Sequence, residues 1–86
     1  MNKASSQKAI TVRYFAQLRE QAKINIETIS TEAETAVTLY DELSQRHGFS
    51  LEQVALRVAV NGAYANWNQS IADGDEVVFI PPVAGG

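Results

Sequence analysis

The sequence contains no cysteine. Disulfides, thiolate nucleophiles, zinc fingers and cysteine-ligated iron–sulfur clusters are therefore excluded. It has one histidine, which cannot build a multi-histidine metal site. No apolar run is long enough to span a bilayer, and residues 1–8 lack the hydrophobic stretch of a secretory signal. These absences predict a cytoplasmic protein that binds no metal or cofactor of its own and does not enter the membrane.

Basic residues are also scarce. Seven lysines and arginines stand against ten acidic residues, for a net charge of −3, which argues against a nucleic-acid binder. The charge is unevenly placed: residues 1–26 carry five bases and one acid, a net charge of +4, whereas residues 27–86 carry two bases and nine acids, a net charge of −7. The acidic part is either an ordinary solvated surface or a face that steers the protein onto a basic partner.

The chain is short, with 86 residues, and 45% of them are apolar. This composition indicates one domain with a modest core. We predict a mobile tail over residues 1–8, a folded domain over 9–80 and an extended tail over 81–86. Runs rich in β-branched and aromatic residues, several of them with an apolar–polar alternation, predict the strands, which cover residues 9–15, 24–29, 56–60, 63–65 and 76–80.

The strongest helical pattern covers Ala36–His47. Its apolar residues recur at helical spacing and form one stripe, made of Ala36, Leu39, Tyr40 and Leu43. Thr35 is a suitable N-cap, and Gly48 is suited to follow the last turn. Residues 16–23 contain good helix formers, but the segment is short, so we predict a wide turn or a single helical turn there.

One amphipathic helix can cover only one face of a small sheet, so the other face should be polar. The last predicted strand contradicts this expectation, because both of its faces are apolar. Val77 and Phe79 alternate with Val78 and Ile80, and Phe15 ends the first strand with a further large apolar side chain. A contiguous apolar surface on the open face of a sheet indicates an interaction site, unless loops cover it.

Few groups in the chain could carry chemistry. His47 falls in the last turn of the predicted helix, where a cation suits the helix dipole. The acidic cluster from Asp73 to Glu76 lacks the spacing of a calcium loop and predicts a turn. Trp67 is predicted to be a half-buried anchor of a polar loop. The serines have no histidine partner within their own elements. We therefore predict no self-contained active site.

The last six residues are unusual. They read Pro-Pro-Val-Ala-Gly-Gly and contain no ionisable side chain. Gly85 and Gly86 can enter a channel too narrow for any side chain, while Pro81 and Pro82 hold the base of the tail extended. The only reactive group presented is the α-carboxylate of Gly86, which is inert until it is converted to a better acyl donor. The tail is therefore predicted to be a substrate for another enzyme, and the alternative is an ordinary frayed terminus.

These residues, taken together, resemble a known family. The segment from Tyr14 to Glu20, the sequence Val58–Gly62, the sequence Asp73–Val77 and the terminal sequence Pro81–Gly86 occur in this order. The chain from about Ile10 onward resembles the small, sulfur-carrier subunits of molybdopterin synthase. The resemblance implies an α+β fold of the ubiquitin-like β-grasp type, with a mixed sheet and one main helix across one face.

The resemblance also implies a function. In that family an E1-like adenylating enzyme consumes ATP to adenylate the terminal glycine, and a sulfur donor protein converts the adenylate to a thiocarboxylate. The carrier then docks on the large subunit of molybdopterin synthase in a heterotetramer and donates sulfur to cyclic pyranopterin monophosphate. The carrier thus acts as a subunit of a sulfurtransferase with no active site of its own.

The implied site can be placed on this sequence. Gly86 would carry the sulfur, and the rest of the tail would thread into the partner through Pro81, Pro82, Val83, Ala84 and Gly85. The apolar partner interface is expected to include Phe15, Tyr64, Val78 and Ile80. Because the chain has no cysteine, sulfur could be carried only at its carboxyl terminus.

Three alternatives remain open from the sequence. The first is a sulfur carrier for another pathway, such as thiazole or cysteine synthesis. The second is a ubiquitin-like modifier joined to lysines of other proteins through Gly86. The third is a plain interaction module whose final glycines have no chemical role. The product formed distinguishes the first two, and tolerance of extra terminal residues identifies the third.

Overall fold

The computed structural model describes residues 7–82, and it contains one five-stranded sheet in the order β2-β1-β5-β3-β4. The predicted residues Val83, Ala84, Gly85 and Gly86, and most of the predicted N-terminal tail, lie outside the described residues. The elements, in chain order, are β1 (Lys8–Tyr14), α1 (Ala16–Ala22), β2 (Ile26–Thr31), α2 (Ala36–His47), the 3-10 helix η2 (Gln53–Ala55), β3 (Arg57–Val60), β4 (Ala63–Ala65) and β5 (Glu76–Ile80).

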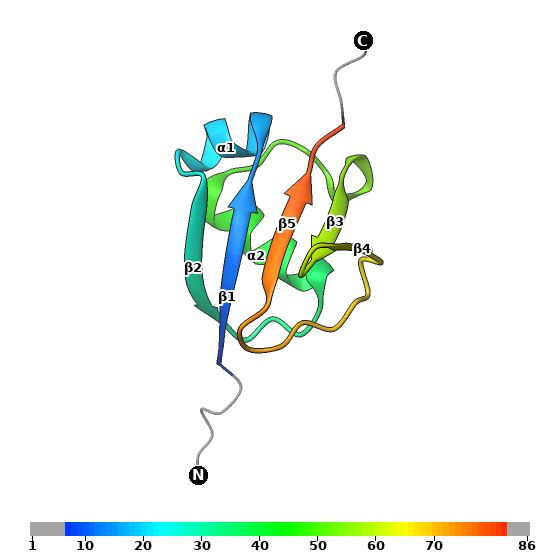
Figure 1. The fold of residues 1–86 in the computed structure, drawn as a ribbon. Helices are drawn as coiled ribbons and strands as arrows, with labels where there is room; N and C mark the ends of the chain where they lie inside the picture. Colours follow the sequence, from blue (N-terminus) through cyan, green and yellow to red (C-terminus); the bar gives the residue numbers. More distant parts are fainter. Residues whose placement is uncertain (1–6, 83–86) are drawn as a thin grey trace.

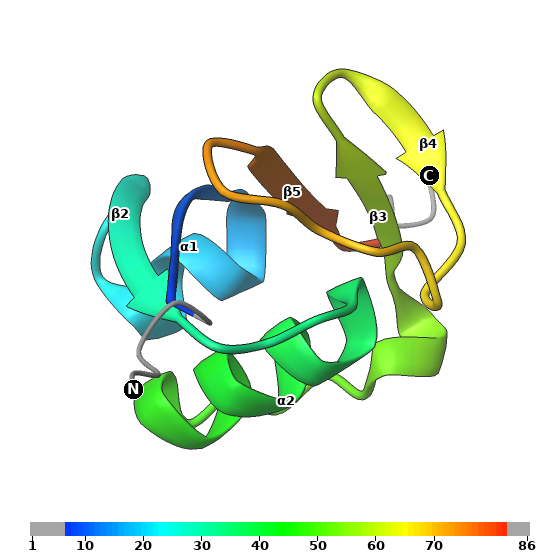
Figure 2. The same cartoon turned by 90° about the horizontal axis from the view of Figure 1, so that it is seen from below.

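The sheet is mixed. β1 pairs antiparallel with β2 and parallel with β5, and β3 pairs antiparallel with both β5 and β4. The long connection from β2 to β3 contains α2, which crosses one face of the sheet (Figures 1 and 2). No helix lies on the opposite face in these views. The predicted fold class, an α+β β-grasp with a mixed sheet and one main helix, is confirmed.

Helix α2 has the predicted bounds because its two ends are well defined. The Thr35 side chain accepts a hydrogen bond from the backbone N–H of Thr38, and the Thr38 hydroxyl accepts one from the N–H of Thr35. At the other end, Gly48 takes a left-handed φ of 73° and its N–H donates to the carbonyl of Ser44. The predicted apolar stripe is fully buried against the sheet, which makes it the helix's contribution to the core.

Trp67 closes one side of this core. Its ring stacks on Phe79 with centroids 5.8 Å apart and meets Tyr40 edge to face. Tyr40 also contacts Phe79 at 5.1 Å and donates its hydroxyl hydrogen to the carbonyl of Leu51 at 2.6 Å. The prediction of a half-buried loop anchor is confirmed, and this loop is thereby held against the helix-facing side of β5.

The prediction for residues 16–23 was wrong in extent, because the segment forms the seven-residue helix α1. Its stability comes from tertiary contacts that propensity does not include. Leu18 is fully buried, and the side-chain amides of Gln17 and Gln21 donate to the hydroxyl of Ser50 at 3.1 and 2.9 Å. Because this helix is longer than predicted, β2 begins at Ile26 and not at the predicted residue 24.

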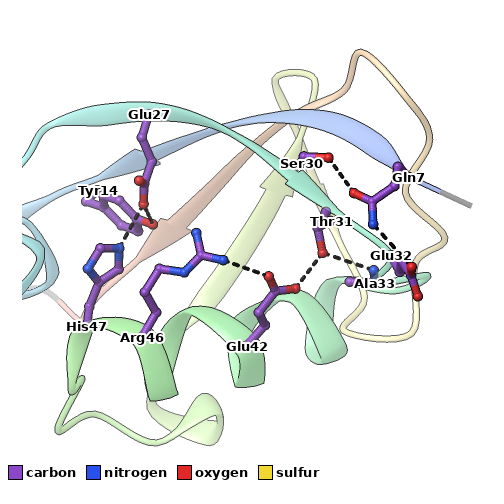
Figure 3. A network of polar contacts seen from close by, with 10 residues as sticks. All are labelled: Gln7, Tyr14, Glu27, Ser30, Thr31, Glu32, Ala33, Glu42, Arg46 and His47. Carbon is purple, nitrogen blue, oxygen red and sulfur yellow. Dashed lines mark hydrogen bonds and ion pairs between the residues drawn. The ribbon is translucent and has the colours of Figure 1, made fainter. Parts of the chain in front are cut away.

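His47 does more than end α2. Its Nε2 lies 2.8 Å from a carboxylate oxygen of Glu27 on β2, and the hydroxyl of Tyr14 on β1 donates to the same oxygen at 2.5 Å (Figure 3). Next to this group, Arg46 donates to Glu42, which also accepts a hydrogen bond from Thr31. Polar contacts therefore connect α2 to the neighbouring strands β2 and β1 along one edge of the core.

The charge of Glu27 depends on these contacts. Burial raises the pKa of the Glu27 carboxyl, but hydrogen bonds from Tyr14 and His47 and the nearby positive charge outweigh burial and lower the pKa below its ordinary 4.5. The pKa of Tyr14 is raised, first by burial and then by Glu27. Glu27 is therefore ionised in the folded protein, and Tyr14 stays protonated as its donor.

This arrangement predicts how stability depends on pH. A carboxyl whose pKa is lower in the folded state stabilises the fold above its unfolded pKa, and this contribution disappears as the pH falls through the folded pKa. The free energy of unfolding should decrease between about pH 5 and pH 3, and Glu27→Gln should make that decrease smaller. Urea titrations at several pH values measure this effect. Glu20→Gln, which removes an exposed carboxylate on α1, is the control, and an equal effect of both changes would contradict the assignment.

Candidate functional site

The sheet face opposite α2, which we call the open face, is the candidate site. Strand β5 lies in the middle of the sheet. Val77 and Phe79 are fully buried toward α2, whereas Val78 and Ile80 are only half-buried on the open face. The predicted two-sided apolar character of this strand is therefore confirmed. One side of β5 completes the core, and the other remains accessible.

Strand pairing brings five side chains into one row across the open face. The paired positions are Ile26–Arg13, Arg13–Val78, Val78–Ala59 and Ala59–Tyr64. Ile26 and Tyr64, at the two ends of the row, are 41% and 68% exposed. Ala59 has a small side chain, which leaves a shallow depression between Val78 and Tyr64. The row is mainly apolar, so it is suited to contact with another protein.

The structure brings together three of the four predicted interface residues. Tyr64, Val78 and Ile80 line one shallow hollow of the open face, together with Ala59 and Gly62. Phe15 lies apart from this hollow but at the same end of the sheet as Ile80, because Tyr14 pairs with Phe79 and the backbone of Phe15 is extended. Its ring is 46% exposed.

Two cations also lie on the open face, and sequence reasoning missed both as parts of the site. Arg13 forms an ion pair with Glu76 on the neighbouring strand β5. The guanidinium of Arg57 lies over the ring of Tyr64, 5.4 Å from its centroid, and Arg57 pairs in register with Ile80. Both belong to β-strands, so their common face becomes visible only when the strand register is known.

The base of the tail leaves the sheet from this same place. Pro81 and Pro82 continue the chain beyond the end of β5 (Figure 1). Proline has a fixed φ and no backbone N–H, so this segment cannot extend the sheet by regular pairing. A groove lies beside it, lined by the segment Val54–Arg57 and by Tyr64, Ile80, Pro81 and Pro82. The start of the tail is therefore next to the exposed apolar side chains.

The acidic cluster near β5 holds a turn. Asp73 accepts a hydrogen bond from the backbone N–H of Ala9 at 2.7 Å. Asp75 accepts bonds from the N–H of Ala72 and from the side-chain amide of Asn61 at 2.8 and 2.9 Å. Within residues 7–82 no group of three or more histidine or acidic side chains could hold a metal ion. None of the helices in that range is long and apolar enough to cross a membrane.

Known proteins resemble this chain over most of its length. The model of the ThiS family matches residues 12–86. The molybdopterin synthase sulfur carrier subunit of Escherichia coli is 35% identical over 80 residues, which are 90% of this chain and 99% of that protein. The sulfur-carrier resemblance expected from the motifs is confirmed.

Solved structures resemble the fold as well. SAMP1 from Haloferax volcanii superposes with a TM-score of 0.73 at 26% identity, over 91% of this chain and 99% of SAMP1. A chain from the complex of subunits 1 and 2 of the molybdopterin-converting factor of Helicobacter pylori gives a TM-score of 0.61 at 26% identity, over 91% of this chain and 99% of that one. From its sequence match and its mixed sheet crossed by a single main helix, we conclude that this chain belongs to the ThiS family of ubiquitin-like β-grasp proteins.

Proposed function

We propose that this protein is the sulfur carrier of molybdopterin biosynthesis. The observation that supports this most strongly is the position of the tail: it starts at Pro81, directly after Ile80 on the open apolar face. One docking event on that face would therefore also direct the following residues into the partner. The match to a sulfur carrier subunit supports this chemistry over the other functions that a docking module could have.

The proposed chemistry takes place at the carboxylate of Gly86. An oxygen of this carboxylate attacks the α-phosphorus of ATP on the E1-like activating enzyme, and pyrophosphate leaves. A sulfur donor protein then supplies sulfur at the oxidation level of sulfide, which attacks the acyl carbon of the adenylate; AMP leaves, and a thiocarboxylate remains. On the large synthase subunit the sulfur attacks a carbon of cyclic pyranopterin monophosphate, and a carbon–oxygen bond of that carbon breaks as the carbon–sulfur bond forms. Water cleaves the resulting acyl–sulfur bond, which regenerates the carboxylate, and two such transfers complete one dithiolene.

In this proposal the folded domain contributes docking and not catalysis. The chain binds no cofactor, and ATP is consumed by the activating enzyme. Phe15, Tyr64, Val78 and Ile80 make the apolar contact, and the residues from Pro81 to Gly85 pass through the partner's channel. The Helicobacter pylori complex of two subunits supports a partner protein of this kind. We propose a heterotetramer with the large subunit, in the cytoplasm.

A ubiquitin-like protein modifier is the second candidate, and carriers for other sulfur pathways share the same fold. SAMP1, whose full name is small archaeal modifier protein 1, has the same fold, so the fold alone does not choose among these functions. The chemistry differs in its nucleophile: a lysine amine would give an isopeptide bond, whereas a sulfur donor gives a thiocarboxylate. Identification of the product on Gly86 separates these candidates.

Docking is tested by Ile80→Asp. Ile80 is half-buried on the open face, so the isolated domain should remain folded. In a complex, however, the new carboxylate would be desolvated without a partner, and binding to the large subunit and to the activating enzyme should be lost. Calorimetric titration with each partner measures the change. The control is Ile24→Asp in the α1–β2 connection, which alters an exposed apolar side chain outside the sheet. Normal binding of Ile80→Asp would contradict the interface.

The terminus is tested by changing its length. Deleting Gly86 moves the carboxylate back by up to about 3.5 Å, whereas a productive arrangement tolerates roughly 0.5 Å. The deletion, and the addition of one residue, should both abolish adenylation while leaving the thermal stability unchanged. Gly86→Ala keeps the carboxylate last and should be milder. ATP–pyrophosphate exchange with the activating enzyme measures adenylation, and full activity of the deletion variant would contradict the sulfur-carrier proposal.

A further inference from the structure

The groove beside the base of the tail is lined by exposed apolar side chains and one arginine. It lies between η2 and β4, next to the end of β5, with a volume of about 340 Å³. Val54 on η2 is 82% exposed, and Tyr64 on β4 is 68% exposed. A site at this small end of the range for binding pockets fits one or two side chains of a protein better than a cofactor.

Arg57 gives this groove a charge. Its guanidinium lies over Tyr64, and none of the carboxylates in residues 7–82 forms an ion pair with it. Two other arginines differ: Arg13 pairs with Glu76, and Arg46 pairs with Glu42 at 3.1 Å. A guanidinium held over an aromatic ring is oriented and can still donate several hydrogen bonds. The groove thus combines an apolar wall with an available cation.

We propose that this groove receives an apolar side chain of the large synthase subunit that is flanked by a carboxylate, and that Arg57 is a specificity-determining residue for this partner. The inference rests on the proposed function and deepens its docking step. It is supported by the continuity of the groove with the open face, since Tyr64 and Ile80 belong to both. It is supported also by charge: a cation beside an apolar surface selects a partner with an anion at that position.

The selection works in both directions. A partner with a carboxylate beside its apolar anchor gains a forked, charge-assisted hydrogen bond to Arg57. A partner without one would cover the guanidinium and leave it desolvated and unpaired, which weakens binding. Proteins of this fold serve different partners, and an apolar face alone distinguishes poorly among them. Arg57 would favour partners that place a carboxylate beside the base of the tail.

The experiment measures the affinity of the full chain for the large subunit. Arg57→Gln should raise the dissociation constant about tenfold, the effect of losing one charge-assisted pair, and should make binding less sensitive to salt. Arg57→Lys should recover part of the affinity, because it keeps the charge but not the fork. Arg46→Gln, which removes a half-exposed arginine on α2 across the sheet, is the matched control and should leave affinity unchanged. Equal melting temperatures of Arg57→Gln, Arg57→Lys and the unchanged protein show that these two changes leave the fold intact.

Two results would overturn the proposal. One is an Arg57→Gln variant with the affinity and salt dependence of the unchanged protein. The other is an Arg57→Gln variant that docks normally but is adenylated faster, which would mean that Arg57 binds the chain's own terminal carboxylate. If the proposed function were wrong and the role of Arg57 correct, the result would differ from both of these. Chemically prepared thiocarboxylate protein would then bind the large subunit with Arg57-dependent affinity and yield no molybdopterin.

Discussion

A single main helix covers only one face of this five-stranded sheet, and the rest of the structure follows from that limit. α2 buries its apolar stripe against β5 and its neighbours. β5 is central and has apolar side chains on both faces, so half of them remain accessible on the open face. Such a surface would be a liability in an isolated protein, and it is explained if another protein covers it.

β5 also connects the open face to the C-terminal residue at which the proposed reaction takes place. The chain leaves β5 through two prolines and, in the proposed function, acts through its last residue. Docking and reaction are then carried by adjacent parts of one segment, while the core lies on the other side of the sheet. Stability, affinity and reactivity should therefore respond to different substitutions. The contacts of Glu27 contribute to stability, Ile80 and Arg57 to docking, and Gly86 to reactivity.

Local patterns predicted the parts of the fold that depend on local physics. The spacing of apolar residues and the two end residues predicted α2, and the alternation from Val77 to Ile80 predicted both faces of β5. The length of α1 was not predictable, because it depends on the burial of Leu18 and on bonds to the distant Ser50. Arg57 and Val54 were missed for the same reason: only the strand register and the loop path bring them beside the tail. The mixed sheet itself was inferred from the family resemblance.

The central claim is that the folded domain delivers sulfur on its last residue. The most direct test is the intact mass of this chain after purification from its native host together with its partners. We predict a population whose mass exceeds that of the unmodified chain by the replacement of one oxygen by sulfur, located on Gly86 by fragmentation and lost after incubation with cyclic pyranopterin monophosphate and the large subunit. A chain found only unmodified, or joined through Gly86 to lysines of other proteins, would contradict this account.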